Sequence, residues 1–137
     1  MNTTSVPILA ARILLALIFM LAGLSKLTGL QGTTAYIASQ GLPIPAVLAL
    51  ASGLLELLAG LAVAIGFKAR LAAALLAAFT LLASLLFHNF WAMPADQAMV
   101  NQLMFMKNLA IVGGLLLIVA HGAGPVSVDT RRLAIAH

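Results

Sequence analysis

The sequence predicts an all-α integral membrane protein, a four-helix bundle whose helices run antiparallel, up-down-up-down, across a bilayer. Of its 137 residues, 64% are hydrophobic and 7% are charged, whereas soluble domains carry about 25% charged residues. A water-facing surface cannot be assembled from so few charges. The sequence also contains four apolar stretches, each near the length that crosses a hydrocarbon core of about 30 Å. We therefore expect one domain, residues 1–137, with spans at about 6–27, 45–67, 71–91 and 103–120.

The first span, residues 6–27, is expected to be a retained helix and not a cleaved signal peptide. Its early positive charge, Arg12, lies inside the apolar run, and no small-residue cleavage site follows cleanly. Arg12, Phe19, Gly23 and Lys26 follow one another at steps of seven, four and three residues, so they share one helix face. This polar and small-residue face is predicted to point into the bundle.

Residues 28–44 form a polar connector rich in glycine and proline, within which residues 33–40 are expected to form a short interfacial helix anchored by Tyr36. The second span, residues 45–67, follows. Small residues share one face of this span, the kind of face that lets helices approach closely in lipid. The members of that face are Ala49, Ser52, Gly53, Glu56, Ala59, Gly60 and Val63.

Glu56 lies at the centre of the second span, 11 positions from either end of the range 45–67. A carboxylate at that depth costs about 2.5–3.5 kcal/mol on insertion scales. It should therefore face protein or water and have a partner. The rest of the chain is interpreted as a cage around this residue, with a purely structural polar clamp as the alternative interpretation.

The second and third spans are joined by the short turn 66–70, which makes them antiparallel neighbours. The third span, 71–91, ends in a polar and aromatic segment, and the connector 92–102 is expected to resume a helix near Ala95. The fourth span, 103–120, is stopped by glycines and Pro125. The remaining tail is expected to be short and poorly ordered.

Lysine and arginine counts near the span ends predict orientation. Four spans place both termini and the turn 66–70 on one side of the membrane. That side carries Arg12, Lys68, Arg70, Arg131 and Arg132, and the other side has Lys26 and Lys107. The bias of five against two predicts that the N-terminus and the C-terminus are both cytoplasmic.

Polar residues gather in the outer half of the predicted bundle, above Glu56. We expect Glu56 and Lys107 to form the closest pair and to be the catalytic candidates, because a rise of about 1.5 Å per residue leaves a vertical gap of only about 4–10 Å between them. Lys26 is expected to snorkel outward or to reach Glu56 through water. The candidate ligand-binding residues are Lys26, His88, Trp91 and Asn108.

Each of these residues also has a structural interpretation. Lys26 and His88 are equally well explained as interfacial anchors. For Trp91, a place in the interfacial aromatic belt is favoured over a ligand contact. Asn108 and the pair Gly113-Gly114 are more typical of helix packing.

Several classes of function are excluded or disfavoured. The absence of cysteine rules out disulfides, thiolate metal sites and thiol redox chemistry by this chain. His88 and His121 fall near opposite ends of the bundle, so they cannot hold one haem, and no metal-ligand spacing is present. We expect neither metal nor haem. The basic residues follow topology without an aromatic-interleaved patch, so no nucleic acid is expected.

Four segments in order resemble the DoxX family of small bacterial membrane proteins. They are Ala22-Gly23-Leu24-Ser25-Lys26-Leu27, Gly53-Leu54-Leu55-Glu56-Leu57-Leu58-Ala59-Gly60-Leu61, His88-Asn89-Phe90-Trp91, and Lys107-Asn108-Leu109 with Gly113-Gly114-Leu115-Leu116. The resemblance extends from about Arg12 to Ala120. It implies a four-helix membrane bundle, in agreement with the spans predicted from hydropathy.

The resemblance also implies a range of functions. The family is named through its resemblance to membrane subunits of a thiosulfate:quinone oxidoreductase. Some members are associated with resistance to quinones, catechols or oxidative stress, others with membrane redox complexes, and distant relatives with assembly or trafficking. We therefore expect a quinone-interacting redox protein or redox-complex subunit in the bacterial inner membrane. Quinone is the candidate cofactor, and the bilayer, a redox partner protein and a second copy of the chain are the candidate partners.

Two other functions are left open by the sequence. One is a non-enzymatic assembly or interaction factor whose polar cluster serves packing. The other is a small transporter centred on Glu56, which is the least favoured because transporters usually contain more spans and unwound helices.

Overall fold

The computed structural model describes residues 5–135, and their side chains as far as Arg131. Within that range the chain is helical and contains no strand, as the composition predicts. Four of its helices are long and apolar enough to cross a membrane. The elements are α1 (Ser5–Thr28), α2 (Leu30–Ser39), α3 (Pro45–Ile65), α4 (Ala69–Phe87), the short 3-10 helix η1 (Phe90–Ala92), α5 (Ala95–His121) and α6 (Val128–Ile135).

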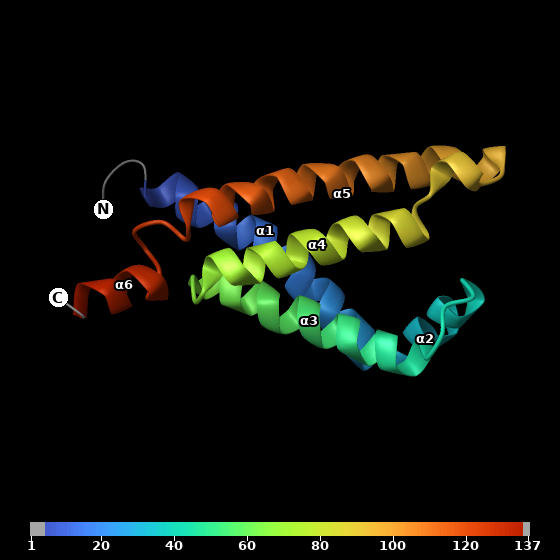
Figure 1. Cartoon of the computed structure of the whole chain (residues 1–137), viewed down its shortest axis with the longest axis horizontal. Helices are drawn as coiled ribbons and strands as arrows, with labels where there is room; N and C mark the ends of the chain where they lie inside the picture. Colours follow the sequence, from blue (N-terminus) through green and yellow to red (C-terminus); the bar gives the residue numbers. More distant parts are fainter. Residues whose placement is uncertain (1–4, 136–137) are drawn as a thin grey trace.

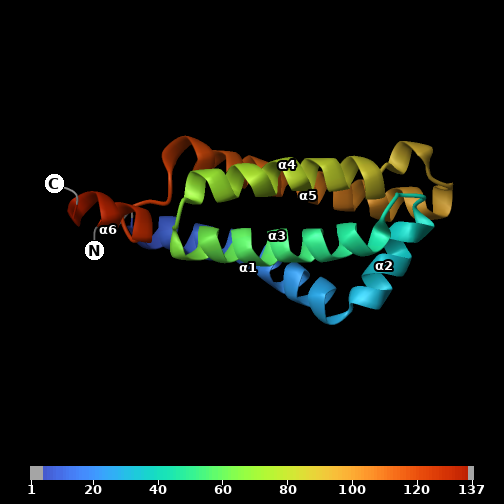
Figure 2. The same ribbon diagram turned by 60° about the horizontal axis from the view of Figure 1, so that its bottom comes forward.

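The four long helices alternate in direction, which confirms the predicted up-and-down bundle (Figures 1 and 2). They pack mainly as two antiparallel pairs, α1 with α3 and α4 with α5, and α3 and α4 join the pairs. Figure 1 shows the pairs diverging toward the end of the bundle that carries α2. We call this the α2 end and the opposite one the α6 end. Both ends of the described chain lie at the α6 end.

Glycines bring α1 and α3 into backbone contact. A Cβ atom placed on Gly23 would lie 2.5 Å from the backbone nitrogen of Leu57 and 2.7 Å from the carbonyl oxygen of Gly53. In lipid, helices associate through such close packing because burial of apolar surface offers little net gain. Arg12, Phe19 and Gly23 are buried, so the predicted inward face of the first span is confirmed. The Glu56 face of α3 is buried in the same interface.

Gly23→Ala is therefore expected to destabilise the protein by about 1–3 kcal/mol, the usual cost of overpacking. The added methyl group meets backbone atoms, which cannot rotate away as a side chain can. Thermal unfolding in detergent, followed by circular dichroism, measures the effect. The matched control is Gly113→Ala in α5, where an added Cβ meets no atom within 4 Å and alanine favours the helix. Equal unfolding temperatures for Gly23→Ala and wild type would contradict this packing.

Two helices differ in extent from the apolar spans. The fourth helix begins at Ala95, directly after Pro94, eight residues before the apolar span that starts at Leu103. This confirms the expectation that the connector resumes a helix near Ala95. The apolar stretch marks where lipid begins, but a helix continues beyond it because its backbone groups stay hydrogen-bonded. The third helix ends at Phe87 and not at Trp91. The chain turns at His88 and Asn89 and then forms η1.

The C-terminal tail is helical, so the expectation of a poorly ordered tail is wrong for the described residues. Two carboxylate oxygens of Asp129 accept hydrogen bonds from the backbone nitrogens of Lys68, at 2.7 Å, and Ala69, at 2.9 Å. These nitrogens open α4 and have no acceptor within their own helix. Asp129 therefore caps the start of α4 although it lies 60 positions after Ala69 in the sequence. The cap fixes α6 against the turn between α3 and α4.

The connector between α1 and α3 contains the predicted short helix, which begins at Leu30 and ends at Ser39. Helix α2 lies obliquely at the α2 end of the bundle, toward which the two helix pairs diverge (Figure 2). Ile37 is buried beneath it, and the ring of Tyr36 stacks on that of Phe87 at the end of α4, with centroids 5.5 Å apart. Helix α2 thus bridges the two diverging helix pairs.

Candidate functional site

A cavity of about 420 Å³ lies between the helix pairs, next to α2. Its volume is within the range of about 300–1,000 Å³ that is typical of small-molecule sites. All five helices α1 to α5 contribute to its wall, and most of the lining side chains are aliphatic or aromatic. The polar or charged side chains among them are Lys26, Thr33, Tyr36, Ser52, Glu56, Thr80, His88, Lys107 and Asn108. The cavity is therefore an apolar pocket with a few polar groups on its walls.

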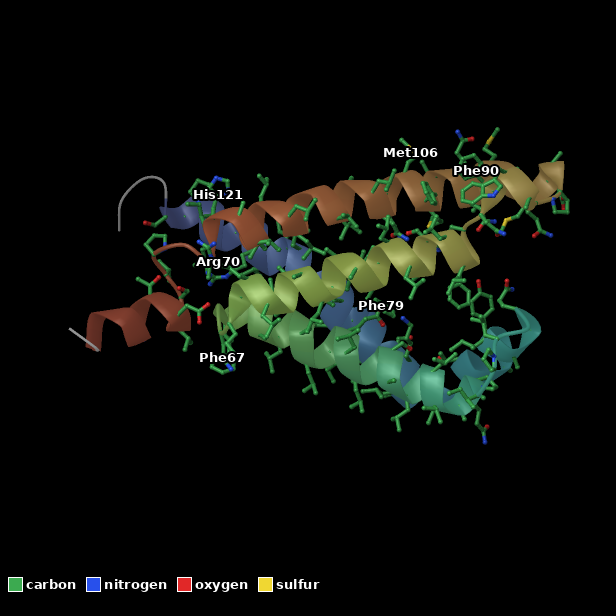
Figure 3. The ribbon with its side chains drawn as sticks, viewed as in Figure 1. Phe67, Arg70, Phe79, Phe90, Met106 and His121 are labelled. Carbon is green, nitrogen blue, oxygen red and sulfur yellow. The ribbon has the colours of Figure 1, made fainter. Side chains whose placement is uncertain are left out.

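The ion pair in this cavity joins Lys26 and Glu56, with Lys26 Nζ donating to Glu56 Oε2. Only 7% of the Glu56 side chain is exposed, against 30% for Lys26. The ammonium also lies 5.4 Å from the ring centroid of Phe79, on the side of α4 that faces α1 and α3 (Figure 3). The prediction of a partner for Glu56 is confirmed, but the prediction that Lys107 is this partner is wrong.

The packing of the helix pairs explains this choice of partner. Close contact between α1 and α3 at Gly23 and Gly53 brings Lys26, three residues after Gly23, beside Glu56. Helix α5 packs on α4 instead. Lys107 therefore lines the opposite wall of the cavity, and its Nζ contacts the sulfur of Met104 at 3.5 Å. Vertical depth alone did not reveal which helices were neighbours.

A second polar group lies on the α4–α5 wall. Asn108 Nδ2 donates to Ser84 Oγ at 2.9 Å, and Ser84 Oγ donates to the carbonyl of Thr80 at 2.7 Å. The Asn108 bond links α5 to α4, which agrees with the packing interpretation, although Asn108 also lines the cavity. The hydroxyl of Thr80 is buried and has no hydrogen-bond partner among the described residues.

Thr80 was not among the candidates from the sequence, although a signal was present. Between Leu71 and Leu86 the only polar side chains are Thr80 and Ser84. They are four residues apart and therefore lie on one face of a helix. Both are buried, and this face of α4 contributes Thr80 to the cavity wall.

His88 and Trp91 differ in their relation to the cavity. His88 lines it, and its Nδ1 lies 3.0 Å from Oδ1 of Asn101. Trp91 is 59% exposed and does not line it. Its ring instead packs edge-on against Phe90 and Phe105, with centroids 5.2 and 5.6 Å away. This packing agrees with the favoured interpretation of Trp91 as a belt aromatic, and the assignment of Trp91 as a ligand contact stays a prediction that this cavity does not support.

An apolar cavity with a few polar groups on its wall suits an apolar molecule that carries polar atoms. Donors approach from both helix pairs: Lys26 from α1 on one side, and Lys107 from α5 on the other. Glu56 places a carboxyl group, which can hold or release a proton, on the cavity wall. Among the described residues, no group of three or more histidine or acidic side chains is placed to hold a metal ion.

Comparisons with known proteins agree with the motifs. A family model described as DoxX matches residues 8–89, more than half of the chain. The inner membrane protein YqjF of Escherichia coli (strain K12) is 44% identical over 127 residues, covering 90% of each chain. The inner membrane protein YphA of the same organism is 36% identical over 126 residues, covering 92% of this chain and 90% of its own. A Surfeit locus protein 4 homolog of Schizosaccharomyces pombe is 38% identical over 72 residues, which are 51% of this chain and 24% of that protein. No solved structure matches significantly.

Proposed function

The chain belongs to the DoxX family, and from this membership and the site we propose a function. On this proposal the cavity binds a quinone, and the protein serves as a quinone-interacting membrane subunit of a redox complex. The names of two relatives that match over 90% of their length favour the bacterial inner membrane as its location. The bias of basic residues favours a cytoplasmic position for the α6 end, near which Arg12, Lys68 and Arg70 lie.

The observation that carries the proposal is the ion pair on the wall of an apolar cavity. A quinone has a flat ring that needs an apolar slot and two carbonyl oxygens that accept hydrogen bonds. An ammonium has three N–H donors, and Lys26 directs one of them to Glu56. The others remain for a ligand oxygen. Glu56 supplies a titratable group next to that oxygen, which the protons that accompany quinone reduction require.

The test is saturable binding of decylubiquinone to the full-length protein in lipid nanodiscs, measured by fluorescence quenching of Trp91. Glu56→Gln is expected to weaken binding about tenfold, because Lys26 is no longer held beside the cavity by a carboxylate. The matched control is Asp96→Asn, which makes the same chemical change in the first turn of α5, away from the lining residues. It should bind as wild type does.

Two results would contradict the proposal. One is a wild-type protein that shows no saturable binding of decylubiquinone or of a menaquinone analogue. The other is a Glu56→Gln protein that is folded and binds with unchanged affinity, since the ion pair would then have no part in the site.

A non-enzymatic assembly or interaction factor is the second candidate function. The feature that favours it is the aromatic cluster of Phe90, Trp91 and Phe105 at the α2 end, where Trp91 is largely exposed. Aromatic residues are enriched in protein interfaces. This function would replace the first one if the protein bound no quinone but was recovered by crosslinking in native membranes with a larger complex attached through η1.

A further inference from the structure

Lys107 carries a positive charge without a carboxylate partner. Its side chain is exposed and lines the cavity, and its Nζ lies 3.5 Å from the sulfur of Met104. It lies four positions after Leu103, where the apolar stretch of α5 begins, or roughly 6 Å along the helix axis. A cation within the apolar part of a membrane helix is costly unless it is paired or hydrated.

None of the three acidic side chains is placed to pair with Lys107. The chain contains three acidic residues in all. Glu56 is paired with Lys26. Asp129 caps α4 at the α6 end of the bundle. Asp96 lies in the first turn of α5, eleven positions before Lys107, or about 16 Å along the axis.

The cavity therefore has one uncompensated positive charge. Lys26 and Glu56 neutralise each other on the α1–α3 wall, and Lys107 stands alone on the α4–α5 wall. In an apolar cavity the attraction between this ammonium and an anion is much stronger than in water. A ligand that brings a negative charge would supply the partner that the chain lacks.

We propose that the cavity selects a ligand whose ring carries a negative charge, and that Lys107 is the residue that binds this charge. The ligand class is a lipophilic aromatic anion, such as a quinone with an ionised ring hydroxyl. The inference rests on the proposed function, because it specifies which quinones the same cavity prefers. Lys26 and Glu56 contact the opposite edge of the ring.

Two matched ligands test the proposal. The first is 2-hydroxy-3-alkyl-1,4-naphthoquinone, which is an anion at neutral pH, and the second is its 2-methoxy ether, which is neutral and of nearly the same shape. Both are titrated into the full-length protein in nanodiscs of zwitterionic lipid, with empty nanodiscs as the partition blank. The hydroxy compound is expected to bind at least about tenfold more tightly than the ether.

Variants of Lys107 then identify the residue responsible. Lys107→Gln should reduce the affinity for the hydroxy compound far more than that for the ether, so that the two affinities become nearly equal. Lys107→Arg should retain the preference because it retains the charge. The matched control is Lys68→Gln, which removes a lysine that does not line this cavity.

The outcomes separate this inference from the function on which it rests. Equal binding of the two ligands by wild type, or a preference that survives in Lys107→Gln, overturns the inference and leaves quinone binding intact. Such a result would mean that Lys107 snorkels to the membrane surface. Failure of both ligands to saturate the protein overturns the inference and the proposed function together. The comparison of ligands on wild type requires no variant to fold.

Discussion

Lys26→Met is expected to destabilise the protein by about 3–5 kcal/mol, the usual cost of removing one partner from a buried ion pair. Glu56 is 6% exposed on α3 and would be left without its ammonium. The reverse change, Glu56→Leu, is expected to cost less. The Lys26 side chain is 30% exposed, so without Glu56 its flexible stem can carry the charge toward water.

The double variant Lys26→Met/Glu56→Leu separates the structural role of the pair from its binding role. Replacing a whole buried ion pair with apolar residues of similar volume is often neutral or stabilising. The double variant should therefore regain most of the stability that Lys26→Met loses. It should nevertheless bind decylubiquinone much more weakly, because the Lys26 donor and the titratable Glu56 are both missing from the α1–α3 wall. Thermal unfolding in detergent and ligand titration in nanodiscs measure the two properties on the same preparations.

The outcome that would contradict this account is a double variant as unstable as Lys26→Met. The cost would then come from lost packing of the lysine stem on Phe79 and the cavity wall, and not from an orphaned carboxylate. A larger loss in Glu56→Leu than in Lys26→Met would contradict it in another way, because it would mean that Lys26 cannot reach water.

The fold was predictable because lipid imposes few solutions on an apolar chain. Hydropathy located four helices, the short turn 66–70 made α3 and α4 antiparallel, and spacing identified the inward face of α1. In lipid every backbone group must be bonded within its helix, so apolar stretches of this length can hardly form anything else. The family resemblance, confirmed by the match over residues 8–89, supported the same architecture.

The partner of Glu56 was not predictable by the same means. Depth along the membrane normal follows from counting residues, and it placed both Lys26 and Lys107 above Glu56. Which lysine reaches the carboxylate depends on which helices touch, and that was decided by Gly23 and Gly53, where α1 and α3 meet backbone to backbone. The sequence does contain a glycine three residues before each member of the pair, Gly23 before Lys26 and Gly53 before Glu56. These glycines identify the partner of Glu56 only once the two helices are known to face each other.

The role of Arg12 could likewise be predicted only in part from the sequence. Its inward face was predicted, but its partners are backbone carbonyls, which no sequence pattern marks. Arg12 is 3% exposed, and its guanidinium donates to the carbonyl oxygens of Ala64, Ala123 and Val126. These carbonyls belong to the end of α3 and to the segment between α5 and α6. One side chain thus joins α1 to the whole α6 end, and it lies at the opposite end of the bundle from α2.

Arg12→Met is consequently expected to be among the most destabilising single substitutions in the chain. It leaves three carbonyl groups without their donor, at about 1–3 kcal/mol for each buried group. Arg12→Lys should recover only part of the loss, because a lysine is a point charge and lacks the fork geometry that reaches several acceptors at once. Thermal unfolding gives the size of the effect. Hydrogen–deuterium exchange shows where it falls, with faster exchange expected for residues 122–131.

The matched control is Arg70→Met, which removes an exposed arginine at the same end of the bundle (Figure 3). It should leave unfolding and exchange close to wild type, so a difference between the variants cannot be attributed to net charge. Because Asp129 also fixes α6, by capping α4, α6 should loosen in Arg12→Met without unfolding α4. Protection of residues 122–131 that is unchanged in Arg12→Met would mean that the cap and the backbone hydrogen bond from Asp129 to Gly66 hold the α6 end, and that the buried guanidinium is dispensable there.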